Sequence, residues 1–370
     1  MKKRTFAVAA IILILVTVTC VTASATPNIS GRAGVLYEPE TGRFLYDKSG
    51  DTRLPMASTT KIMTALVVWE NALLQEYVTV DGRAAGTEGS SAYLAEGDVL
   101  TVEELLYALL LQSANDAAVA LACHVGGSVE DFADMMNAKA RELGLTDTHF
   151  TNPHGLDDDE HYTTARELAL IASELLREPV LREIVSTYKK TFSSEERTRT
   201  YVNHNKLLRL YDGAIGVKTG YTKRCGRCLV GAAERDGLVM ITVTLDAPDD
   251  WRDHTAMLDY GFDRLYKLVL TEPGEHSYTV GIPDGTAETV KVENTDGLSV
   301  ILENKDAEIK EYVKLSRMAT APVRRGDVLG KVIYTADGEY AGEVGLIATE
   351  TVEKKDGRSF IEKLFSKIFR

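Results

Sequence analysis

The chain has 370 residues and a formal net charge of −13, with 26% charged and 44% hydrophobic residues. This length allows two folded domains, and the hydrophobic fraction is sufficient for a buried core. The acidic excess argues against a nucleic-acid partner, because a phosphate backbone is bound by clustered Lys and Arg.

The first 25 residues have the pattern of an export signal. Basic residues 2–4 precede an apolar run from Phe6 to about Val18, and Ala23-Ser24-Ala25 offers a small-residue cleavage site. The alternative is a membrane-spanning anchor, for which the run is short because a span takes about 20 residues. Cleavage here removes three bases and no acid, so the net charge of −13 becomes −16.

Strands and helices are predicted to alternate from residue 31 to about 270. Apolar patterns divided by turn residues predict paired strands at Val35–Tyr37 with Phe44–Tyr46, and at Leu229–Ala233 with Leu238–Leu245. Longer apolar patterns predict helices at Lys61–Leu74, Val102–Leu121, Ala165–Leu176 and Asp253–Leu268. This mixture indicates an α/β (α+β) domain.

Beyond residue 272 the pattern changes to short alternating runs. Asp-Gly pairs punctuate strands predicted at Thr289–Val292, Leu298–Leu302, Tyr312–Leu315 and Val328–Tyr334. A small β-rich domain is therefore expected. It contains no catalytic constellation, and spacing or partner contact is its expected role.

The last residues predict an amphipathic helix. Residues 359–370 place aromatic and aliphatic side chains on one face and charged ones on the other, and residues 354–370 carry six bases against two acids. Such a helix suits the surface of an anionic membrane. The alternative is a terminal helix docked on the core of the protein itself.

The segment Pro55-Met56-Ala57-Ser58-Thr59-Thr60-Lys61 places a hydroxyl and an amine three residues apart. Residues i and i+3 of a helix share a face, so Ser58 and Lys61 can hydrogen-bond there. A lysine whose charge is suppressed by burial and nearby cations can accept the serine proton. Free N–H groups at a helix start can also hold an oxyanion. The spacing predicts Ser58 as nucleophile and Lys61 as base.

Two further motifs follow in order. Ser113-Ala114-Asn115 supplies a hydroxyl that can relay a proton and an amide that can donate and accept. Lys218-Thr219-Gly220 places a cation and a hydroxyl on a predicted strand edge, with a glycine where the backbone approaches a ligand closely. Together the three motifs predict one composite site.

Two of the motifs have a second match in the chain. Ser186-Thr187-Tyr188-Lys189 also fits Ser-x-x-Lys, but it lies in a polar stretch, whereas Ser58 begins an apolar helix. Lys48-Ser49-Gly50 also fits Lys-[Ser/Thr]-Gly, but it lies before the nucleophile in a polar turn. Context therefore favours Ser58 and Lys218.

The ordered set Ser-x-x-Lys, Ser-x-Asn and Lys-Thr-Gly resembles that of the penicillin-recognising serine enzymes. The similarity is closest to the low-molecular-mass penicillin-binding proteins, the serine-type D-alanyl-D-alanine carboxypeptidases. Further stretches carry the resemblance: 57–66, Phe150-Thr151-Asn152-Pro153-His154-Gly155-Leu156, 161–165 and 217–222. It extends over nearly the whole chain after the export signal.

The resemblance implies a fold and a domain plan. Residues 1–25 would be the signal peptide, and residues 26–271 a serine DD-peptidase/β-lactamase-like catalytic domain with a helical subdomain. Residues 272–350 would form the β-rich domain, and residues 351–370 an amphipathic membrane-anchor tail. The expected location is the outer face of the cytoplasmic membrane, in the cell wall compartment.

The resemblance also implies catalytic roles. Ser58 would be acylated, Lys61 would be its base, and Ser113 would relay the proton to the leaving amine. The backbone N–H groups of Ser58 and Tyr221 would form the oxyanion hole. The implied substrate is a peptidoglycan stem peptide ending in D-Ala-D-Ala, and β-lactam antibiotics would acylate the same serine.

The substrate-binding roles come from the same resemblance. Asn115 would hold the peptide group of the substrate, Lys218 would supply positive potential, and Thr219 would bind the terminal carboxylate. Gly220 and Tyr221 complete the expected binding set. No cofactor and no metal are implied.

Two other functions compete with this interpretation. A β-lactamase shares fold and nucleophile, but the chain has no Glu-x-x-x-Asn segment, so the deacylating glutamate of the class A pattern lacks a candidate. A non-catalytic peptidoglycan-binding scaffold would be expected to lose Ser or Lys from the motifs, and here each position is filled.

Other signals are interpreted as structural. Three histidines between 149 and 161 lie near an acidic run without His-Glu-x-x-His spacing, which favours a solvated loop over a metal site. Cys225 and Cys228 have redox-motif spacing without a thioredoxin-like context, so a pair of thiols is expected, although oxidation at Cys225 could disturb the Lys218 strand. Arg252 is interpreted as a solvated residue at a helix start.

Overall fold

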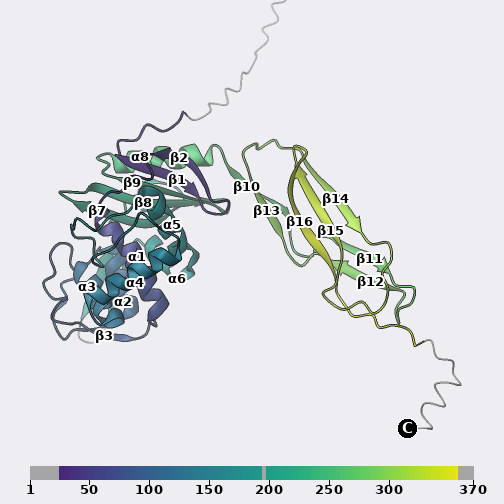
Figure 1. Cartoon of the computed structure of the whole chain (residues 1–370), viewed down its shortest axis with the longest axis horizontal. Helices are drawn as coiled ribbons and strands as arrows, with labels where there is room; N and C mark the ends of the chain where they lie inside the picture. Colours follow the sequence, from purple (N-terminus) through teal and green to yellow (C-terminus); the bar gives the residue numbers. More distant parts are fainter. Residues whose placement is uncertain (1–24, 194–196, 357–370) are drawn as a thin grey trace, which may run out of the picture.

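The computed structural model describes residues 25–193 and 197–356, which form a mixed α/β part followed by a β-rich part (Figure 1). This arrangement confirms the predicted fold class. The predicted amphipathic helix at 359–370 and all but the last residue of the predicted signal peptide lie outside the described residues.

A five-stranded antiparallel sheet forms the centre of the first part. Its strands are β1 (Ala33–Glu38), β2 (Arg43–Lys48), β7 (Ala214–Thr222), β8 (Gly226–Arg235) and β9 (Leu238–Leu245), in the order β2-β1-β9-β8-β7. The two predicted strand pairs are confirmed as β1–β2 and β8–β9. Because β7 lies at the edge of the sheet, its outer side is free to border a site.

Helices cover the sheet and build a helical region beside it (Figure 1). They are the 3-10 turn η1 (Ala57–Thr60), α1 (Lys61–Asn71), α2 (Val102–Leu111), α3 (Asn115–Gly126), α4 (Val129–Glu142), α5 (Ala165–Arg177), α6 (Pro179–Ser186), α7 (Leu207–Leu210) and α8 (Asp250–Phe262). Two short strand pairs complete this part: β3 (Tyr77–Thr79) with β4 (Val99–Thr101), and β5 (Lys189–Ser193) with β6 (Thr198–Val202).

The prediction of one continuous helix over Val102–Leu121 is wrong. Helix α2 ends at Leu111, and α3 begins at Asn115. Ser113 adopts a left-handed backbone with φ of 62°, which a helix interior does not accommodate. The apolar pattern continues through the break because both helices are buried, and so periodicity alone misses it. The break places Ser113 in a connection.

The predicted helix Asp253–Leu268 is also wrong at both ends. Helix α8 runs from Asp250 to Phe262, and the residues that follow form β10 (Tyr266–Thr271). The run Tyr266-Lys267-Leu268-Val269-Leu270 is short enough to pair as a strand. This strand opens the β-rich part.

The β-rich part contains two sheets. β10 pairs with β13 (Leu298–Leu302). The other five strands are β11 (Ser277–Gly281), β12 (Thr289–Glu293), β14 (Ile309–Leu315), β15 (Val328–Ala336) and β16 (Glu339–Ala348), in the order β11-β12-β16-β15-β14. The four strands predicted here are confirmed as β12, β13, β14 and β15. The core of this β-rich part includes the buried side chains of Val280, Val292, Val332 and Leu346.

The two parts are joined by ion pairs at their boundary. Lys267 Nζ lies 2.6 Å from Glu40 Oε2, and Arg43 Nη1 lies 2.9 Å from Glu303 Oε1.

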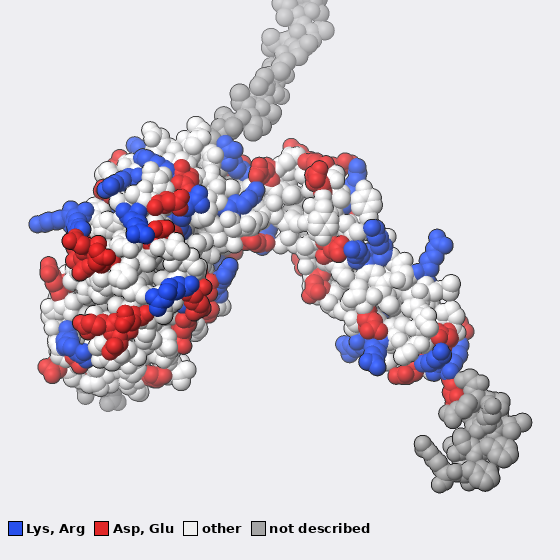
Figure 2. Space-filling model, viewed as in Figure 1, with Lys and Arg blue, Asp and Glu red and all other residues white. Residues whose placement is uncertain are grey.

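On the face seen in Figure 2, Lys and Arg side chains are scattered among Asp and Glu side chains over both parts. Within the described ranges, no helix has the length and apolarity to cross a membrane.

Candidate active site

The nucleophile candidate Ser58 lies in the 3-10 turn η1, and Lys61 is the first residue of α1. Lys61 Nζ lies 3.0 Å from Ser58 Oγ. Ala57, just before the serine, has a φ of 48°, which non-glycine residues rarely adopt and which marks a constrained turn. The three-residue spacing therefore produces the expected contact, on a 3-10 turn that leads into the α-helix.

The partners of the Lys61 amine decide where its lone pair points. Besides Ser58 Oγ, Nζ contacts Asn115 Oδ1 at 2.7 Å and the backbone oxygen of His154 at 2.6 Å. Both of these oxygens can only accept, so they take the two N–H groups of a neutral amine. The lone pair is left for Ser58, whose O–H can donate to it. The geometry suits proton transfer from Ser58 to Lys61.

A glycine-containing loop fixes the orientation of Asn115. Its Nδ2 donates to Glu88 O at 2.6 Å, and its backbone N–H donates to Ser90 O at 2.7 Å. A Cβ at Gly89, whose φ is 93°, would lie only 2.7 Å from Nδ2. The amide oxygen therefore faces Lys61. Within the chain Asn115 contacts Lys61, and its expected contact with the peptide group of the substrate stays a prediction.

A second loop carries the carbonyl of His154. Asn152 Oδ1 accepts from Gly155 N at 2.7 Å, and Thr64 Oγ1 donates to Pro153 O at 2.6 Å. Gly155 has a φ of 86°, and a Cβ there would lie 1.9 Å from the backbone oxygen of Ala57. The loop packs directly on the nucleophile turn. Sequence reasoning noted this stretch but missed its contact with Lys61.

Burial and charge set the protonation of the two motif lysines. Both side chains are buried. Burial lowers the pKa of Lys61 well below that of an ordinary lysine, the positive charge of Lys218 lowers it further, and Asp116 opposes the shift. Burial lowers the pKa of Lys218 to about 7. Lys61 is therefore suited to act as a neutral base.

The motifs meet at a cavity of about 340 Å³. It is lined by Ser58, Ser90, Ser113, His204, Lys206, Thr219, Gly220, Tyr221, Arg227, Asp250 and Trp251. Lys61, Asn115 and Lys218 lie buried behind this lining, and Lys218 Nζ donates to Thr219 O at 3.0 Å. The structure thus brings residues of all three motifs to one site.

Gly220 packs against the nucleophile turn. A Cβ on it would lie 3.0 Å from Ser58 N and 3.1 Å from Met56 O. The glycine therefore permits a close approach of β7 to the nucleophile turn, and its contact with a ligand stays a prediction. Tyr221, the next residue, lines the same cavity as Ser58.

Six lining residues were missed from the sequence: Ser90, His204, Lys206, Arg227, Asp250 and Trp251. Arg227 reaches the cavity because the β7–β8 register places it opposite Tyr221. The others reach the cavity from loops and helix ends. No spacing in the sequence links these segments to the motifs.

The second matches to the motifs lie outside this cavity. Ser186 Oγ donates to Arg182 O of its own helix at 2.8 Å, and Lys189 is exposed on β5. Lys48 Nζ donates to Ile29 O at 2.9 Å. Arg252 is exposed at the third position of α8, as expected.

The histidines and cysteines that were interpreted as structural lie away from any metal or redox arrangement among the described residues. His161 Nε2 lies 2.7 Å from Thr60 Oγ1. Over the described ranges, no group of three His, Cys, Asp or Glu side chains is arranged to hold a metal ion. Cys225 and Cys228 are buried free thiols, and burial raises their pKa values to about 11 and about 12.

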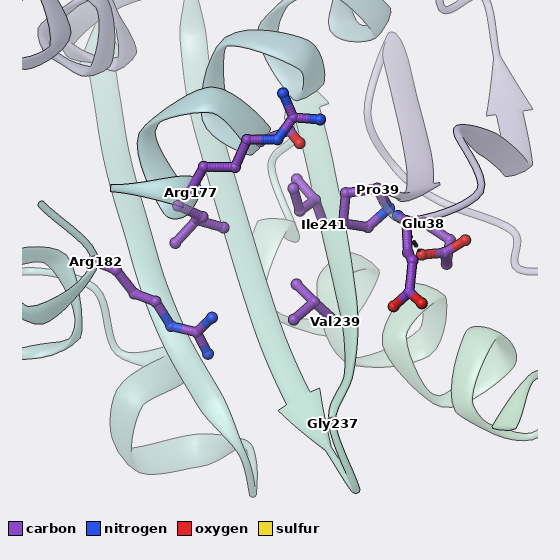
Figure 3. A pocket seen from close by; sticks show the side chains of 10 residues that line it. Glu38, Pro39, Arg177, Arg182, Gly237, Val239 and Ile241 are labelled. Carbon is purple, nitrogen blue, oxygen red and sulfur yellow. Dashed lines mark hydrogen bonds between the residues drawn. The ribbon is translucent and has the colours of Figure 1, made fainter. Parts of the chain in front are cut away.

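Another cavity, of about 410 Å³, lies away from the motifs. It is lined by Glu38, Pro39, Glu40, Ser173, Leu176, Arg177, Arg182, Gly237, Val239 and Ile241 (Figure 3). Arg177 pairs with Glu174 at 2.9 Å, and Arg182 pairs with Glu234. Glu38 accepts the backbone N–H groups of residues 40 and 41. Both arginines are paired within the protein, the Glu38 carboxylate is hydrogen-bonded, and none of the motif residues lies here.

The fold and the site are those of a serine peptidase. Comparison with known proteins agrees. A profile of the D-alanyl-D-alanine carboxypeptidase family matches residues 20–249, and a profile of the penicillin-binding protein 5 C-terminal domain matches residues 269–354. The chain belongs to the D-alanyl-D-alanine carboxypeptidase family and is a hydrolase.

Individual relatives cover most of the chain. D-alanyl-D-alanine carboxypeptidase DacF of Bacillus subtilis is 32% identical over 343 residues, which is 90% of this chain and 88% of the relative. D-alanyl-D-alanine carboxypeptidase of Streptomyces strain K15 is 38% identical over 262 residues, which is 65% of this chain and 90% of the relative. The crystal structure of penicillin-binding protein 5 from Haemophilus influenzae superposes with a TM-score of 0.67 at 29% identity and covers 89% of this chain and 99% of that one.

Proposed function

We propose that this protein removes the terminal D-Ala from peptidoglycan stem peptides through an acyl-enzyme on Ser58. The observation that carries the proposal is the arrangement around Lys61 Nζ, which leaves the lone pair of a buried amine for Ser58 Oγ at 3.0 Å. The membership in the carboxypeptidase family and the names of its relatives support the substrate class.

The reaction has two steps. Ser58 Oγ attacks the carbonyl carbon of the penultimate D-Ala while its proton passes to Lys61. The N–H groups of Ser58 and Tyr221 hold the oxyanion. The C–N bond then breaks, and Ser113 relays the proton to the departing D-Ala amine. Water hydrolyses the Ser58 ester and restores the hydroxyl.

The same chemistry makes β-lactams covalent inhibitors, because their strained amide is attacked by the same serine. A β-lactamase would free itself from that ester quickly. The test is the release of D-Ala from a D-Ala-D-Ala peptide, measured beside the turnover of penicillin. We expect fast D-Ala release and slow penicillin hydrolysis, and the reverse would identify a β-lactamase.

A catalytically silent scaffold on the same fold is the other alternative. Covalent labelling by a fluorescent penicillin distinguishes it from an enzyme. We expect wild-type protein to be labelled and Ser58→Ala to remain unlabelled. An unlabelled wild-type protein that still binds peptidoglycan would favour the scaffold.

The location of the protein is also part of the proposal. Cleavage after residue 25 would export it, and the cationic amphipathic segment 359–370 would hold it at the outer face of the cytoplasmic membrane. The catalytic domain would extend to residue 271 and the β-rich domain from 272 to 350. Deletion of 359–370 should release the mature protein from membranes, and retention would show that the anchor lies elsewhere.

A further inference from the structure

Asp116 is a buried acid that the three motifs do not include. It directly follows Ser113-Ala114-Asn115, lies in the first turn of α3, and is 1% exposed. A carboxylate is costly to bury unless its oxygens are paired or hydrogen-bonded. The hydrogen bonds that satisfy this carboxylate therefore indicate what it does.

The Asp116 carboxylate gathers a segment that precedes α2 in the chain. Its Oδ2 accepts from Ser91 Oγ at 2.6 Å and from Leu94 N at 3.0 Å, and its Oδ1 accepts from Ala92 N at 3.0 Å. The backbone N–H of Ala117 also donates to Oδ1, at 2.9 Å. Hydrogen bonds to an ionised acceptor are stronger than neutral ones. The segment is therefore folded around the carboxylate.

The same segment holds the Asn115 side chain. The backbone oxygens of Glu88 and Ser90 accept from the side-chain and the backbone nitrogen of Asn115, at 2.6 Å and 2.7 Å. Asn115 Oδ1 in turn accepts from Lys61 Nζ at 2.7 Å. A series of contacts thus leads from the Asp116 carboxylate, through this segment, to the Lys61 amine.

Charged side chains act on the Lys61 amine from two neighbouring elements. Lys218 of β7 lowers the pKa of Lys61, and Asp116 of α3 opposes that lowering. Two histidines also lie near this amine, but burial lowers the pKa of His154 to about 3 and that of His161 to about 4. Both histidines are therefore neutral at pH 7 and add no charge.

Proton transfer changes the balance of these charges. When Ser58 gives its proton to Lys61, the amine becomes a buried cation close to Lys218, and the like charge disfavours it. The Asp116 carboxylate has the opposite sign and favours that cation. Its charge therefore acts on the step in which the serine is activated.

We propose that Asp116 is a positioning residue for the acylation of Ser58. Its carboxylate ties the segment 88–94 to α3, which keeps the Asn115 amide on Lys61, and its negative charge stabilises the lysine once the serine proton has arrived. Asp116 is not among the residues that line the catalytic cavity, so it acts through its neighbours. This inference rests on the proposed function and deepens it.

The matched control is Asp131. It lies in the first turn of α4, and Ser128 Oγ donates to its Oδ2 at 2.6 Å, the same distance as between Ser91 and Asp116. Unlike Asp116, it is exposed. Asp131→Asn therefore removes the same kind of hydrogen bond and the same charge at a solvated position.

The experiment measures the rate of penicillin acylation as a function of pH by stopped flow. We expect Asp116→Asn to acylate about 10- to 100-fold more slowly at neutral pH, because hydrogen bonds to a charged group are lost. Its acid limb should move to lower pH, because loss of the carboxylate charge lowers the pKa of Lys61 further. Ser91→Ala keeps the charge, so it should slow acylation by only about 2- to 10-fold and leave the limb in place. Asp131→Asn should match wild type.

The folded state of each variant is checked by urea unfolding. Asp116→Ser removes the charge without placing an amide donor against the backbone N–H groups, and it replaces Asp116→Asn if that variant does not fold. A wild-type rate and acid limb after loss of the Asp116 charge would overturn the inference. A slower enzyme with an unmoved limb would also overturn it, because a carboxylate that only supports the fold leaves the limb in place. An equal shift in Asp131→Asn would have the same consequence.

The release of D-Ala by wild type tests the proposed function separately. A wild type that penicillin acylates without any release of D-Ala from the peptide would remove the carboxypeptidase function. The pH profiles of the variants would still decide the role of Asp116 in acylation.

Discussion

Two segments of this chain carry the Ser-x-x-Lys spacing, and only one of them forms a site. Ser58 and Lys61 lie where a 3-10 turn leads into a buried helix, and their side chains meet at 3.0 Å. Ser186 ends α6, Lys189 lies on the exposed strand β5, and the serine hydroxyl bonds to its own helix. The Ser-x-x-Lys spacing brings the serine and lysine side chains together only where the backbone stays helical through both residues. The lysine must also be buried for its pKa to fall.

The partners of the two lysines explain the difference further. Lys61 contacts oxygens from the start of α3 and from the loop at His154, both distant in sequence, and burial lowers its pKa. Lys189 is exposed to water. An exposed lysine lacks the burial that lowers the pKa of Lys61.

The largest expected effect separates the two serines. Ser58→Ala should lower the rate of D-Ala release on the order of 10⁴-fold or more, because the nucleophile is absent. Ser186→Ala should leave it unchanged. Release from the peptide and mass-spectrometric detection of the penicillin adduct measure this, and an adduct in Ser58→Ala would place the nucleophile elsewhere.

The next effect separates the two lysines. Lys61→Arg replaces the neutral amine by a guanidinium that does not deprotonate, so acylation by penicillin should slow by about 10²- to 10⁴-fold. Lys189→Arg should acylate at the wild-type rate. Stopped-flow acylation measures both variants. A fast Lys61→Arg enzyme would contradict a neutral lysine as base.

A smaller effect concerns the loop that packs on the nucleophile turn. Gly155→Ala should destabilise the fold by about 2 kcal/mol or more, because alanine disfavours a positive φ and its Cβ would meet Ala57 O. Gly144→Ala has a similar φ of 73° with no atom within 4 Å, so it should cost about 1 kcal/mol. Urea unfolding measures both free energies, and equal losses would contradict the packing argument.

The smallest effect is a shift in pH dependence. The positive charge of Lys218 helps to lower the pKa of Lys61, so Lys218→Gln should raise the Lys61 pKa and move the acid limb of the acylation profile to higher pH. Lys189→Gln is the control and should leave the limb in place. The pH profile of penicillin acylation measures the shift. Movement to lower pH would contradict the charge argument.

The sequence alone determined the order of the three motifs, the choice of Ser58 over Ser186, and the β-rich character of the C-terminal part. It could do so because motif order and hydrophobic period are local properties of the chain. Two helix predictions, Val102–Leu121 and Asp253–Leu268, were wrong because a local hydrophobic period does not mark where a buried helix ends. Buried apolar residues continue through the break at Ser113, and the strand β10 follows α8 with only a short gap.

Tertiary structure decided what surrounds the motifs. It turned Asn115 and the carbonyl of His154 onto Lys61, and it brought Arg227 into the cavity through strand register. It also lowered the pKa of both motif lysines, because burial removes the water that stabilises their charge. These properties depend on contacts between segments far apart in the chain, which a spacing of residues does not encode.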